Sequence, residues 1–535
     1  MSISMAQPDN MHELDSMAAL RQSVRNRIGI SGDVEDDELL YHVEQASKDI
    51  KDLFATSFGP RGLNKIIISP TSDIYMTSDG KTIIEQIDVL HPVVTFLKEL
   101  ARSMDTACGD GTKTAVIFAA SLVENAARLA DYGLHPATII KGYQLALNKA
   151  YEILEYESTE ALSEEDLYSV IENASLSKGV EYGQAKMITD VVLKTLSELK
   201  RLNDDARIDL NEYVKVIKKV GGPAMECVPG IVLDEKPARD DMPSHFKDAK
   251  ILLLNYNVKF ESKIINSQHN IRVEGVDNSL LFLREQMSSL KHLAGKIIAS
   301  GADVVLCEGS VDESVEESLA KHGILLFKKL KMKDIEKISQ ATGASIISIK
   351  DEISPDDLGF ADKVTVEKKC NEYFLSLSVQ DQPISTILIW EPFSYGLEKV
   401  EEAVDDALNN AAFLLKKPHV VNGGGGIEFV LSQMLKKYAS TIDGKEQLAV
   451  IEYANALEEI PRILARNAGL NEVDAMSAML SYYNKGIDSR IDYCRKVTEN
   501  YPPVYDSSSI KKLCVIAATE ATNSVLRIDK ILLKK

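Results

Sequence analysis

The sequence predicts a multidomain protein of the α plus α/β class, with an α/β domain inserted into a helical domain that both ends of the chain build. A chain of 535 residues is longer than one hydrophobic core usually supports. Its first and last parts carry apolar residues at helical spacing, whereas short β-branched or Leu-rich runs alternate with helical segments from residue 247 onwards. Two helical regions that flank an α/β region indicate one discontinuous domain and one insertion.

The first helix is expected from about Glu38 to the Gly59-Pro60 pair, which ends it. The apolar residues on one face of this helix are Val43, Ala46, Ile50, Leu53 and Phe54. A second helix, expected from Thr112 to Ala130, is apolar nearly all round, which predicts that it is buried inside the helical domain.

In the central region, strands are expected at residues 249–256, 302–308, 323–330 and 344–349, and a long helix is expected from about Asp277. This alternation is typical of an α/β domain of about 150 residues. Long helices return after about Leu397, and the last is expected from Ile510 to Leu533. The apolar stripe predicted for that last helix is Leu513, Ala517, Ala521, Val525 and Ile528.

Composition excludes several classes of partner. The 81 acidic and 61 basic residues give a formal charge of -20, which disfavours nucleic acid and anionic membranes because phosphate binding needs clustered Lys and Arg. The six cysteines are scattered without a CxxC pair, so buried thiols in a reducing compartment are expected rather than a zinc site. Residues 1–20 lack the features of a signal peptide, and no apolar run approaches the roughly 18 residues of a membrane span. We therefore expect a cytoplasmic protein.

Four glycine-bearing turns carry an acidic or hydroxyl residue beside them: residues 59–62, 77–82, 109–114 and 423–426. Glycine lets backbone N–H groups approach a phosphate closely, and a helix N-terminus adds unpaired donors. Asp79 and Asp110 stand where a Mg²⁺ ion or an attacking water can be held. Taken singly, each turn is more often a structural device than a binding site.

Familiar nucleotide motifs do not fit. Gly80-Lys81-Thr82 looks like the end of a Walker A loop, but Tyr75 stands where that loop needs glycine. The glycine run at 423–426 also lacks the last glycine of the dinucleotide pattern. Asp406 lies about 200° around its helix from the apolar Val404, so it points away from the core stripe, either into a cleft or into solvent.

Seven motifs make the combination specific; they are GPRGLNKIII, TSDGKTIIEQIDVLHP, GDGTKTAV, HPATIIKGYQLALNKA, NGGGGIE, ALEEIPRILARNAGL and ATEATNSVLRIDKI. In this order they closely resemble the group II chaperonins, the thermosome and eukaryotic cytosolic chaperonin family, over about residues 38–535. The resemblance implies a helical equatorial domain (38–146 and 404–535), a small intermediate domain (147–216 and 368–403) and an inserted α/β apical domain (217–367). It also implies a flexible N-terminal extension (1–37) and a helical protrusion, or lid, at about 261–287.

The resemblance further implies an ATP and Mg²⁺ site. Asp79 and Asp406 resemble the catalytic carboxylates that orient the hydrolytic water, and Asp110 resembles the metal-binding residue. The residues that resemble nucleotide contacts are Gly59, Pro60, Gly62, Gly80, Gly111, Thr112, Lys113, Thr114, Lys178, Gly424, Gly425 and Asp488. Lys178 resembles the lysine that senses the γ-phosphate, and Asp488 a residue near the base.

This chain departs from the family at several places. A small residue is usual at Lys81 and Thr at Lys113, so two extra cations are expected near the phosphates, where they either tighten nucleotide binding or slow product release. The segments 391–396 and 489–509 also differ from the family pattern, which affects the contacts expected with the base and with neighbouring subunits.

The leading hypothesis is an ATP-dependent chaperone subunit that captures unfolded proteins and encloses them under its lid in a double-ring chamber of identical or sister subunits. Four consecutive apolar residues, Leu280–Leu283, cannot all face one side of a helix, so they either bind clients or pack within the lid. One alternative is a chaperonin-like ring subunit with weak or no ATPase and a structural role. Another, a metabolic kinase or ligase, lacks a recognisable acid-base pair for a small substrate.

Overall fold

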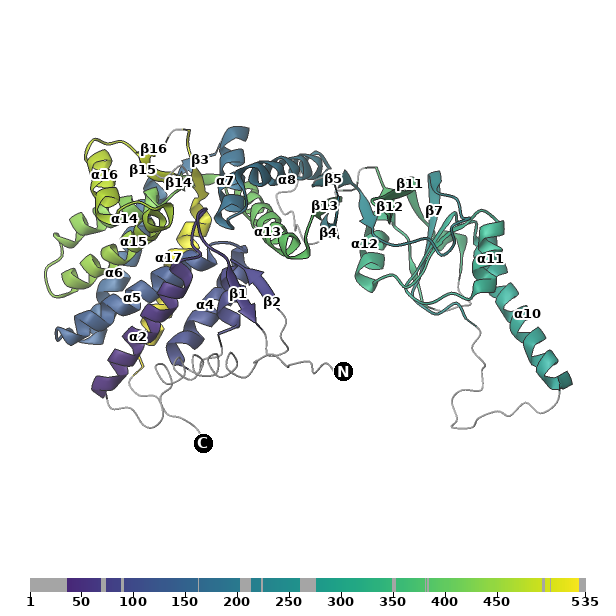
Figure 1. Cartoon of the computed structure of the whole chain (residues 1–535), viewed down its shortest axis with the longest axis horizontal. Coiled ribbons are helices and arrows are strands. Elements are labelled where there is room, and N and C mark those ends of the chain that lie inside the picture. The colour runs from purple at the N-terminus through teal and green to yellow at the C-terminus, as the bar shows by residue number, and fades with distance from the viewer. Residues whose placement is uncertain are drawn as a thin grey trace, which may run out of the picture. The chain divides into compact units, whose positions relative to one another are not determined.

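The computed structural model describes residues 36–68, 74–87, 91–161, 163–202, 213–222, 225–259, 276–348, 353–380, 382, 384–492, 496–500 and 502–528. The chain divides into two compact units (Figure 1). Unit 1 consists of Met1–Val192 together with Glu398–Lys535, and unit 2 consists of Leu193–Leu397. One unit therefore combines both ends of the chain, and the other is inserted between them.

Unit 1 is mainly helical. Its helices are α2 (Asp36–Ala55), α3 (Gly80–Glu85), α4 (Pro92–Cys108), α5 (Thr112–Asp131), α6 (Pro136–Tyr156), α7 (Glu164–Ser177), α14 (Gly426–Ala439), α15 (Glu446–Ala468), α16 (Glu472–Asn484) and α17 (Ser508–Val525). Two further helices, α8 (Tyr182–Leu202) and α13 (Ser394–Lys416), run from one unit into the other. The predicted helix Thr112–Ala130 is confirmed as α5, which packs against α2, α4, α15 and α17 at the centre of the unit.

Aromatic rings and buried hydroxyls fix the packing around α5. Phe118 and Tyr143 both meet the ring of Tyr453 edge-on, at centroid distances of 5.3 and 5.5 Å. The Tyr143 hydroxyl donates to the carbonyl oxygen of Leu122 at 2.9 Å, and the Tyr453 hydroxyl lies 2.7 Å from that of Thr519. Because each buried hydroxyl has a partner, these rings contribute apolar contact without the penalty of an unsatisfied polar group.

Unit 1 also contains small sheets of short strands. β1 (Lys65–Ile68) pairs antiparallel with β2 (Ile74–Thr77), and β15 (Ser489–Asp492) pairs antiparallel with β16 (Lys496–Glu499). A third sheet has the order β17-β14-β3. Its strands are β17 (Tyr505–Ser507), β14 (His419–Asn422) and β3 (Thr159–Glu160). Two of these sheets matter for function, because β2 leads into Asp79 and β15 carries side chains of the cavity described below.

Unit 2 is α/β. Its main sheet has the order β6-β12-β11-β7-β8-β9, with β10 paired to β7. These strands are β6 (Ile231–Leu233), β7 (His245–Leu254), β8 (Val304–Cys307), β9 (Leu325–Phe327), β10 (Ile346–Ile347), β11 (Gly359–Lys369) and β12 (Glu372–Ser378). A smaller sheet contains β4 (Val214–Val220), β13 (Ser385–Glu391) and β5 (Glu226–Pro229). The helical elements are α10 (Val276–Ser300), α11 (Glu313–Lys321), α12 (Met332–Thr342) and the 3₁₀ turn η1 (Pro355–Asp357).

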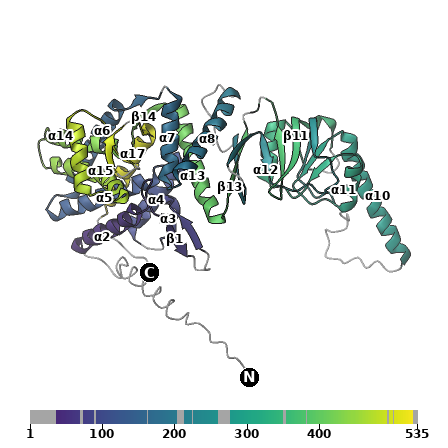
Figure 2. The ribbon, with the colours of Figure 1, turned by 45° about the horizontal axis from the view of Figure 1, so that its top comes forward.

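The strands in the parallel part of this sheet are apolar without interruption, because helices cover both faces of the sheet. All four side chains of β8 are buried, and α11 with α10 lies on one side of the sheet and α12 on the other (Figure 2). The predicted strand–helix alternation is thereby confirmed. The predicted lid at 261–287 lies outside the described residues up to 275, as does the predicted N-terminal extension up to residue 35.

Two expected features of the helices differ from the structure. The first helix ends at Ala55, four residues before Gly59, because Ser57 and Phe58 already form a turn. In α17 the buried residues include Ile510, Cys514, Ala518, Thr519, Thr522 and Val525. The predicted stripe is shifted toward the flank of the core, because α17 packs against three helices and buries more than one face.

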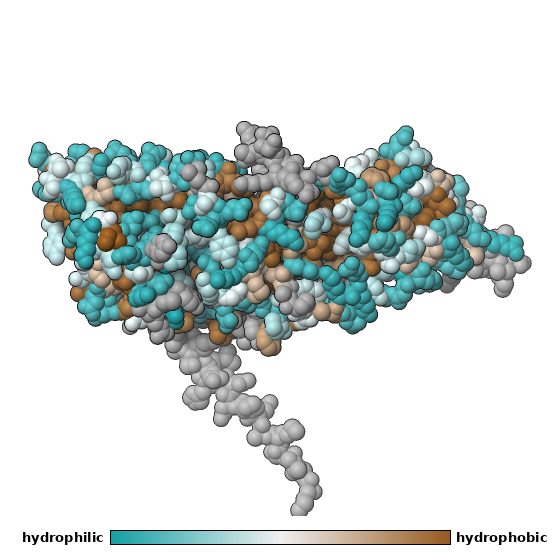
Figure 3. Space-filling view, turned by 90° about the horizontal axis from the view of Figure 1, so that it is seen from above, coloured by the Kyte–Doolittle hydropathy of each residue, from teal (hydrophilic) through white to brown (hydrophobic). Residues whose placement is uncertain are grey.

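The face of the molecule in Figure 3 is largely hydrophilic, with apolar residues interspersed. Among the described residues, no helix combines the length and apolar character that a membrane span requires.

The close approach of α6 and α15 generates a prediction. A Cβ atom on Gly142 would lie 2.5 Å from the Cβ of Ala449 and 2.9 Å from the carbonyl oxygen of Glu446. Overpacking costs about 1–3 kcal/mol, which exceeds the gain of up to about 1 kcal/mol in helix propensity. Gly142→Ala should therefore lower the midpoint of thermal unfolding. Gly183→Ala on α8, where a Cβ meets nothing within 4 Å, should leave it unchanged or raise it; equal effects would contradict the packing argument.

Candidate nucleotide and carboxylate site

A deep cavity in unit 1 collects residues from segments far apart in the sequence. About 160 Å³ of it is open to the centres of water molecules, roughly ten times what one water needs. The predicted site residues that line it are Gly59, Pro60, Asp79, Gly80, Asp110, Gly111, Thr112, Lys113, Thr114, Lys178, Gly424 and Gly425. The structure therefore brings all four glycine-bearing turns to one place.

Two helices begin at the cavity without a side-chain cap. The residue before α5 is Gly111 (φ 78°) and the residue before α14 is Gly425 (φ 81°); both have the left-handed backbone that glycine adopts without strain. Neither offers a side chain to the first-turn N–H groups; the N–H of Gly426 donates to the Gly423 carbonyl oxygen at 3.1 Å, and the others stay available to an anion. The helix dipoles add to this preference for negative charge.

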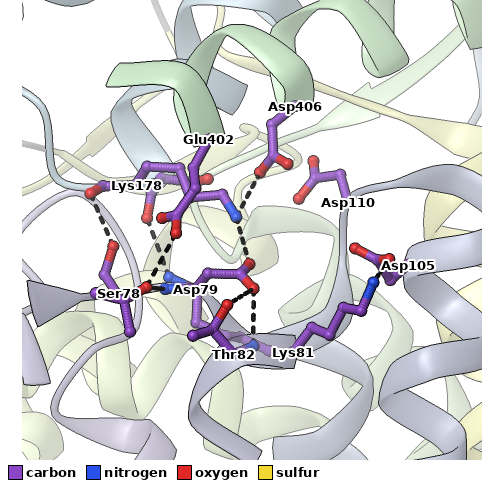
Figure 4. Close-up of polar contacts among 12 residues, drawn as sticks. Ser78, Asp79, Lys81, Thr82, Asp105, Asp110, Lys178, Glu402 and Asp406 are labelled. Carbon is purple, nitrogen blue, oxygen red and sulfur yellow. Dashed lines mark hydrogen bonds and ion pairs between the residues drawn. The ribbon is translucent and has the colours of Figure 1, made fainter. Parts of the chain in front are cut away.

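Lys178 occupies the centre of a buried charge cluster (Figure 4). It caps the C-terminus of α7, and its Nζ donates to Asp79 Oδ1 at 2.8 Å and lies 3.0 Å from Asp406 Oδ2. The Ser78 hydroxyl donates to the Lys178 carbonyl oxygen at 3.1 Å, and Lys399 Nζ donates to the carbonyl oxygen of Gly179 at 2.6 Å. One ammonium group thus joins the segment after β2, the end of α7 and the middle of α13.

The two carboxylates that share Lys178 have opposite protonation tendencies. Burial alone would raise the pKa of Asp79, but the charge of Lys178 and hydrogen bonds from Lys178 and Thr82 hold this pKa well below its usual value. Burial raises the pKa of Asp406 well above its usual value, and the nearby Asp110 and Asp79 add to this effect against the attraction of Lys178. Asp79 is therefore the charged partner of Lys178, and Asp406 is the one that retains a proton more readily.

Asp110 stands at the end of the cluster nearest α5. Its Oδ2 accepts from Asn410 Nδ2 at 2.7 Å, and the same amide donates to the Asp406 carbonyl oxygen at 3.0 Å. No group of three or more His, Cys, Asp or Glu side chains within the described ranges is arranged to hold a metal ion on its own. A single carboxylate suits Mg²⁺ that is bound mainly through phosphate oxygens and water.

Lys113 reaches into the cavity from α5. Its Nζ donates to the carbonyl oxygens of Ser57 at 3.0 Å and Ser177 at 3.3 Å, so it links the turn at 59–62 to the end of α7. Burial lowers its pKa to about 8, with a further lowering by Lys178 against the attraction of Asp79, Asp406 and Asp110. The other expected extra cation, Lys81, instead pairs with Asp105 at 2.6 Å and does not line the cavity.

The cavity lining also combines apolar and polar side chains. Its apolar lining includes Val170, Ile460, Leu464, Ile491 and Val504. Lys511 Nζ donates to Glu428 Oε1 at 2.5 Å and lies 2.9 Å from Asp506 Oδ2, and Asn173 donates to Asp506 Oδ1 at 2.6 Å. A cavity that combines apolar lining with a few polar groups suits a nucleoside.

Three predicted residues lie outside the cavity lining. The N–H of Gly62 donates to the Gly59 carbonyl oxygen at 2.9 Å, and a Cβ there would lie 2.4 Å from the Ser57 carbonyl oxygen, so this glycine closes the turn. Asp406 is 4% exposed and reaches the site through Lys178, which contradicts the solvated alternative. Asp488 is exposed, and the following strand β15 supplies Arg490, Ile491 and Asp492 to the lining instead.

Sequence reasoning missed several contributors. Asn410 could have been found, because it follows Asp406 by four residues and lies on the same face of α13. Glu402, one turn before Asp406, carries the same signal. Lys511, Asp506 and Asn173 carry no such signal, since they meet only in the folded chain.

Comparison with known proteins defines the class to which this fold and site belong. The model of the TCP-1/cpn60 chaperonin family matches residues 50–535, and the chain belongs to that family. It has the multidomain α plus α/β chaperonin fold.

Within the family, the chain is a group II chaperonin subunit, because the similar curated proteins are thermosome subunits. It is 34% identical to thermosome subunit alpha of Aeropyrum pernix over 504 residues, covering 91% of this chain and 90% of the relative. It is 34% identical to thermosome subunit beta of Saccharolobus solfataricus over 497 residues, covering 91% and 89%. Thermosome subunit beta of Methanothermobacter thermautotrophicus is 32% identical over 495 residues, with 91% and 90% covered.

The central ion pairs predict a pH-dependent loss of stability. Lys178→Met leaves Asp79 and Asp406 buried without their cation, which costs about 3–5 kcal/mol. The folded-state pKa of Asp79 then rises above its unfolded value, so the folded variant binds more protons than the unfolded chain and loses stability as pH rises above about 4. Thermal unfolding should show a larger deficit at pH 7.5 than at pH 5.

Lys81→Met is the matched control, because its pair with Asp105 is partly exposed and worth less than about 1 kcal/mol. A deficit in Lys178→Met that is equally small, or that does not depend on pH, would show that the cluster does not stabilise unit 1 electrostatically.

Proposed function

We propose that this group II chaperonin subunit binds ATP with Mg²⁺ in the unit 1 cavity, hydrolyses it, and couples hydrolysis to the folding of captured proteins. The observation that carries this proposal is the convergence of two helix N-termini without side-chain caps, three lysines and four acidic side chains on one cavity that also has apolar lining. The first-turn N–H groups of these helices suit phosphates, and the apolar lining suits the base.

In this proposal each residue has a stated task. Asp110 holds Mg²⁺, which when bound neutralises charge on the phosphates. Asp79 and Asp406 orient the attacking water, and the higher pKa of Asp406 suits the acceptance of a proton from it. Lys178 lies between them and is the cation best placed to meet a terminal phosphate.

The same proposal extends to assembly and location. The subunit forms a double ring with identical or sister subunits in the cytoplasm, binds unfolded proteins, and closes over them with the lid predicted at 261–287. A ring subunit with weak or no ATPase is the second candidate, and the observation that favours it is the surplus of buried carboxylates beside the phosphate-binding end.

Hydrolysis is tested by replacing the carboxylates separately. Asp406→Asn should bind Mg-ATP with unchanged affinity and hydrolyse it at least ~100-fold more slowly, because a positioned general base typically contributes that much. Asp110→Asn should instead weaken binding only when Mg²⁺ is present. Steady-state ATPase and equilibrium titration with and without Mg²⁺ measure both.

Asp405→Asn, an exposed neighbour of Asp406 on α13, serves as the control and should hydrolyse ATP at the wild-type rate. Normal turnover in Asp406→Asn would remove its catalytic role, and the absence of turnover in the wild type would favour the structural subunit.

Lys113 predicts a pH dependence of affinity. Its protonated form attracts phosphate, and its pKa of about 8 means that this attraction fades as pH rises through 8. Lys113→Met should weaken ATP binding at least ~tenfold at pH 7, as expected for the loss of a charged hydrogen bond, and should abolish the decline of affinity between pH 8 and pH 9. Isothermal titration between pH 6.5 and 9 measures it, and an unchanged pH profile in the variant would refute the role.

A further inference from the structure

One face of α13 carries four polar side chains at a spacing of three or four residues: Lys399, Glu402, Asp406 and Asn410. Asp406 contacts Lys178, Asn410 contacts Asp110, and Lys399 holds the turn next to Lys178. Glu402 is the remaining member of this row, and none of the roles described above uses it.

Glu402 is fixed to the segment that carries Asp79. Its Oε1 accepts from the Thr77 hydroxyl at 3.1 Å, and the same hydroxyl accepts from the Asp79 N–H at 2.9 Å. The other oxygen, Oε2, is buried and has no hydrogen-bond partner among the described residues. A buried carboxylate oxygen without a donor is far more costly in the charged form than in the protonated form.

The charges that face Glu402 come from several elements. Lys178 at the end of α7 and Asp79 beside β2 act on it most strongly, Lys113 acts from α5, and Lys399 and Asp406 flank it on α13. Burial raises the pKa of Glu402 to about 7, and Asp79 raises it while Lys178 lowers it. Asp79 and Asp406 already share Lys178, so an ionised Glu402 adds a further negative charge opposite one ammonium.

We propose that Glu402 is a positioning residue for Lys178, and that its protonation state sets how readily the Lys178 ammonium leaves the site's own carboxylates for the terminal phosphate of a nucleoside triphosphate. This inference rests on the proposed function of the cavity. Ionised Glu402 holds Lys178 back and repels the phosphate, whereas protonated Glu402 does neither. The Thr77 bond persists in both forms, because Oε1 accepts whether or not Oε2 carries a proton. Affinity for ATP therefore weakens as pH rises through neutrality.

Glu402→Gln isolates the charge, because the amide oxygen still accepts from Thr77 and the side chain keeps its shape. KM for ATP and kcat of the full chain are measured from pH 6 to pH 8 for the variant, the wild type and Glu398→Gln, a control that removes an exposed acid one turn earlier on α13. The ratio of wild-type to Glu402→Gln KM should be near one at pH 6 and about tenfold at pH 8, the order expected for one added charge near a polyanion at an effective dielectric constant of about 20. The kcat ratio should stay within about twofold, and Glu398→Gln should match the wild type.

Titration of Lys113 is common to all three chains and cancels in the ratio. A KM ratio that does not change with pH overturns the inference even if every chain hydrolyses ATP. A wild type without ATPase activity refutes the proposed function instead, and the same ratio is then taken from dissociation constants for ATP relative to ADP. If Glu402→Gln does not fold, Lys113→Met gives the second readout: its ATP affinity should still fall between pH 6 and pH 8, and a flat profile overturns the inference.

Discussion

The structure of unit 1 depends on one buried ammonium group. Lys178 is 5% exposed and contacts carboxylates from two other segments, so removing any one of the three leaves a buried charge without its full compensation. The cluster joins residues nearly 100 and more than 200 positions apart, which are the separations of Lys178 from Asp79 and Asp406. Electrostatics therefore couples α13 and α7 to the loop after β2, and any displacement of these elements changes the charge balance of the cavity.

The position of this cluster explains why unit 1 contains both ends of the chain. The cavity is lined by residues of α5 from the first half of the chain and by residues of the turn before α14, of β15 and of α17 from the second half. The apolar packing of α5 against α15 and α17 holds these segments together, with the ring of Tyr453 between Phe118 and Tyr143. The core thus supplies the stability that lets several uncompensated polar groups remain at the cavity.

The sequence predicted the elements far better than the contacts between them. α5 and the strands of unit 2 follow from composition and spacing alone, since a helix that is apolar all round and unbroken β-branched runs each have one favourable environment. The glycine-bearing turns were visible in the sequence, but the prediction that they form one site rested on the family resemblance. Glu402, Asn410 and Lys511 were missed, because an acid, an amide or a lysine on a helix looks solvated until tertiary packing buries it. The opposite error concerns Lys81, which was expected at the site because it lies in one of the motifs. In the structure it pairs with Asp105 instead.

The cluster around Lys178 carries more acids than cations. Asp79, Asp110, Glu402 and Asp406 outnumber Lys113 and Lys178 in it. The cavity lining also includes Arg61, Arg490 and Lys511, so under the proposed function these cations, the N–H groups at the start of α5 and a divalent cation together attract phosphate. The raised pKa values of Asp406 and Glu402 act in the same direction, because each proton retained removes one negative charge. Under the proposed function, nucleotide occupancy and protonation are therefore two linked properties of one cluster.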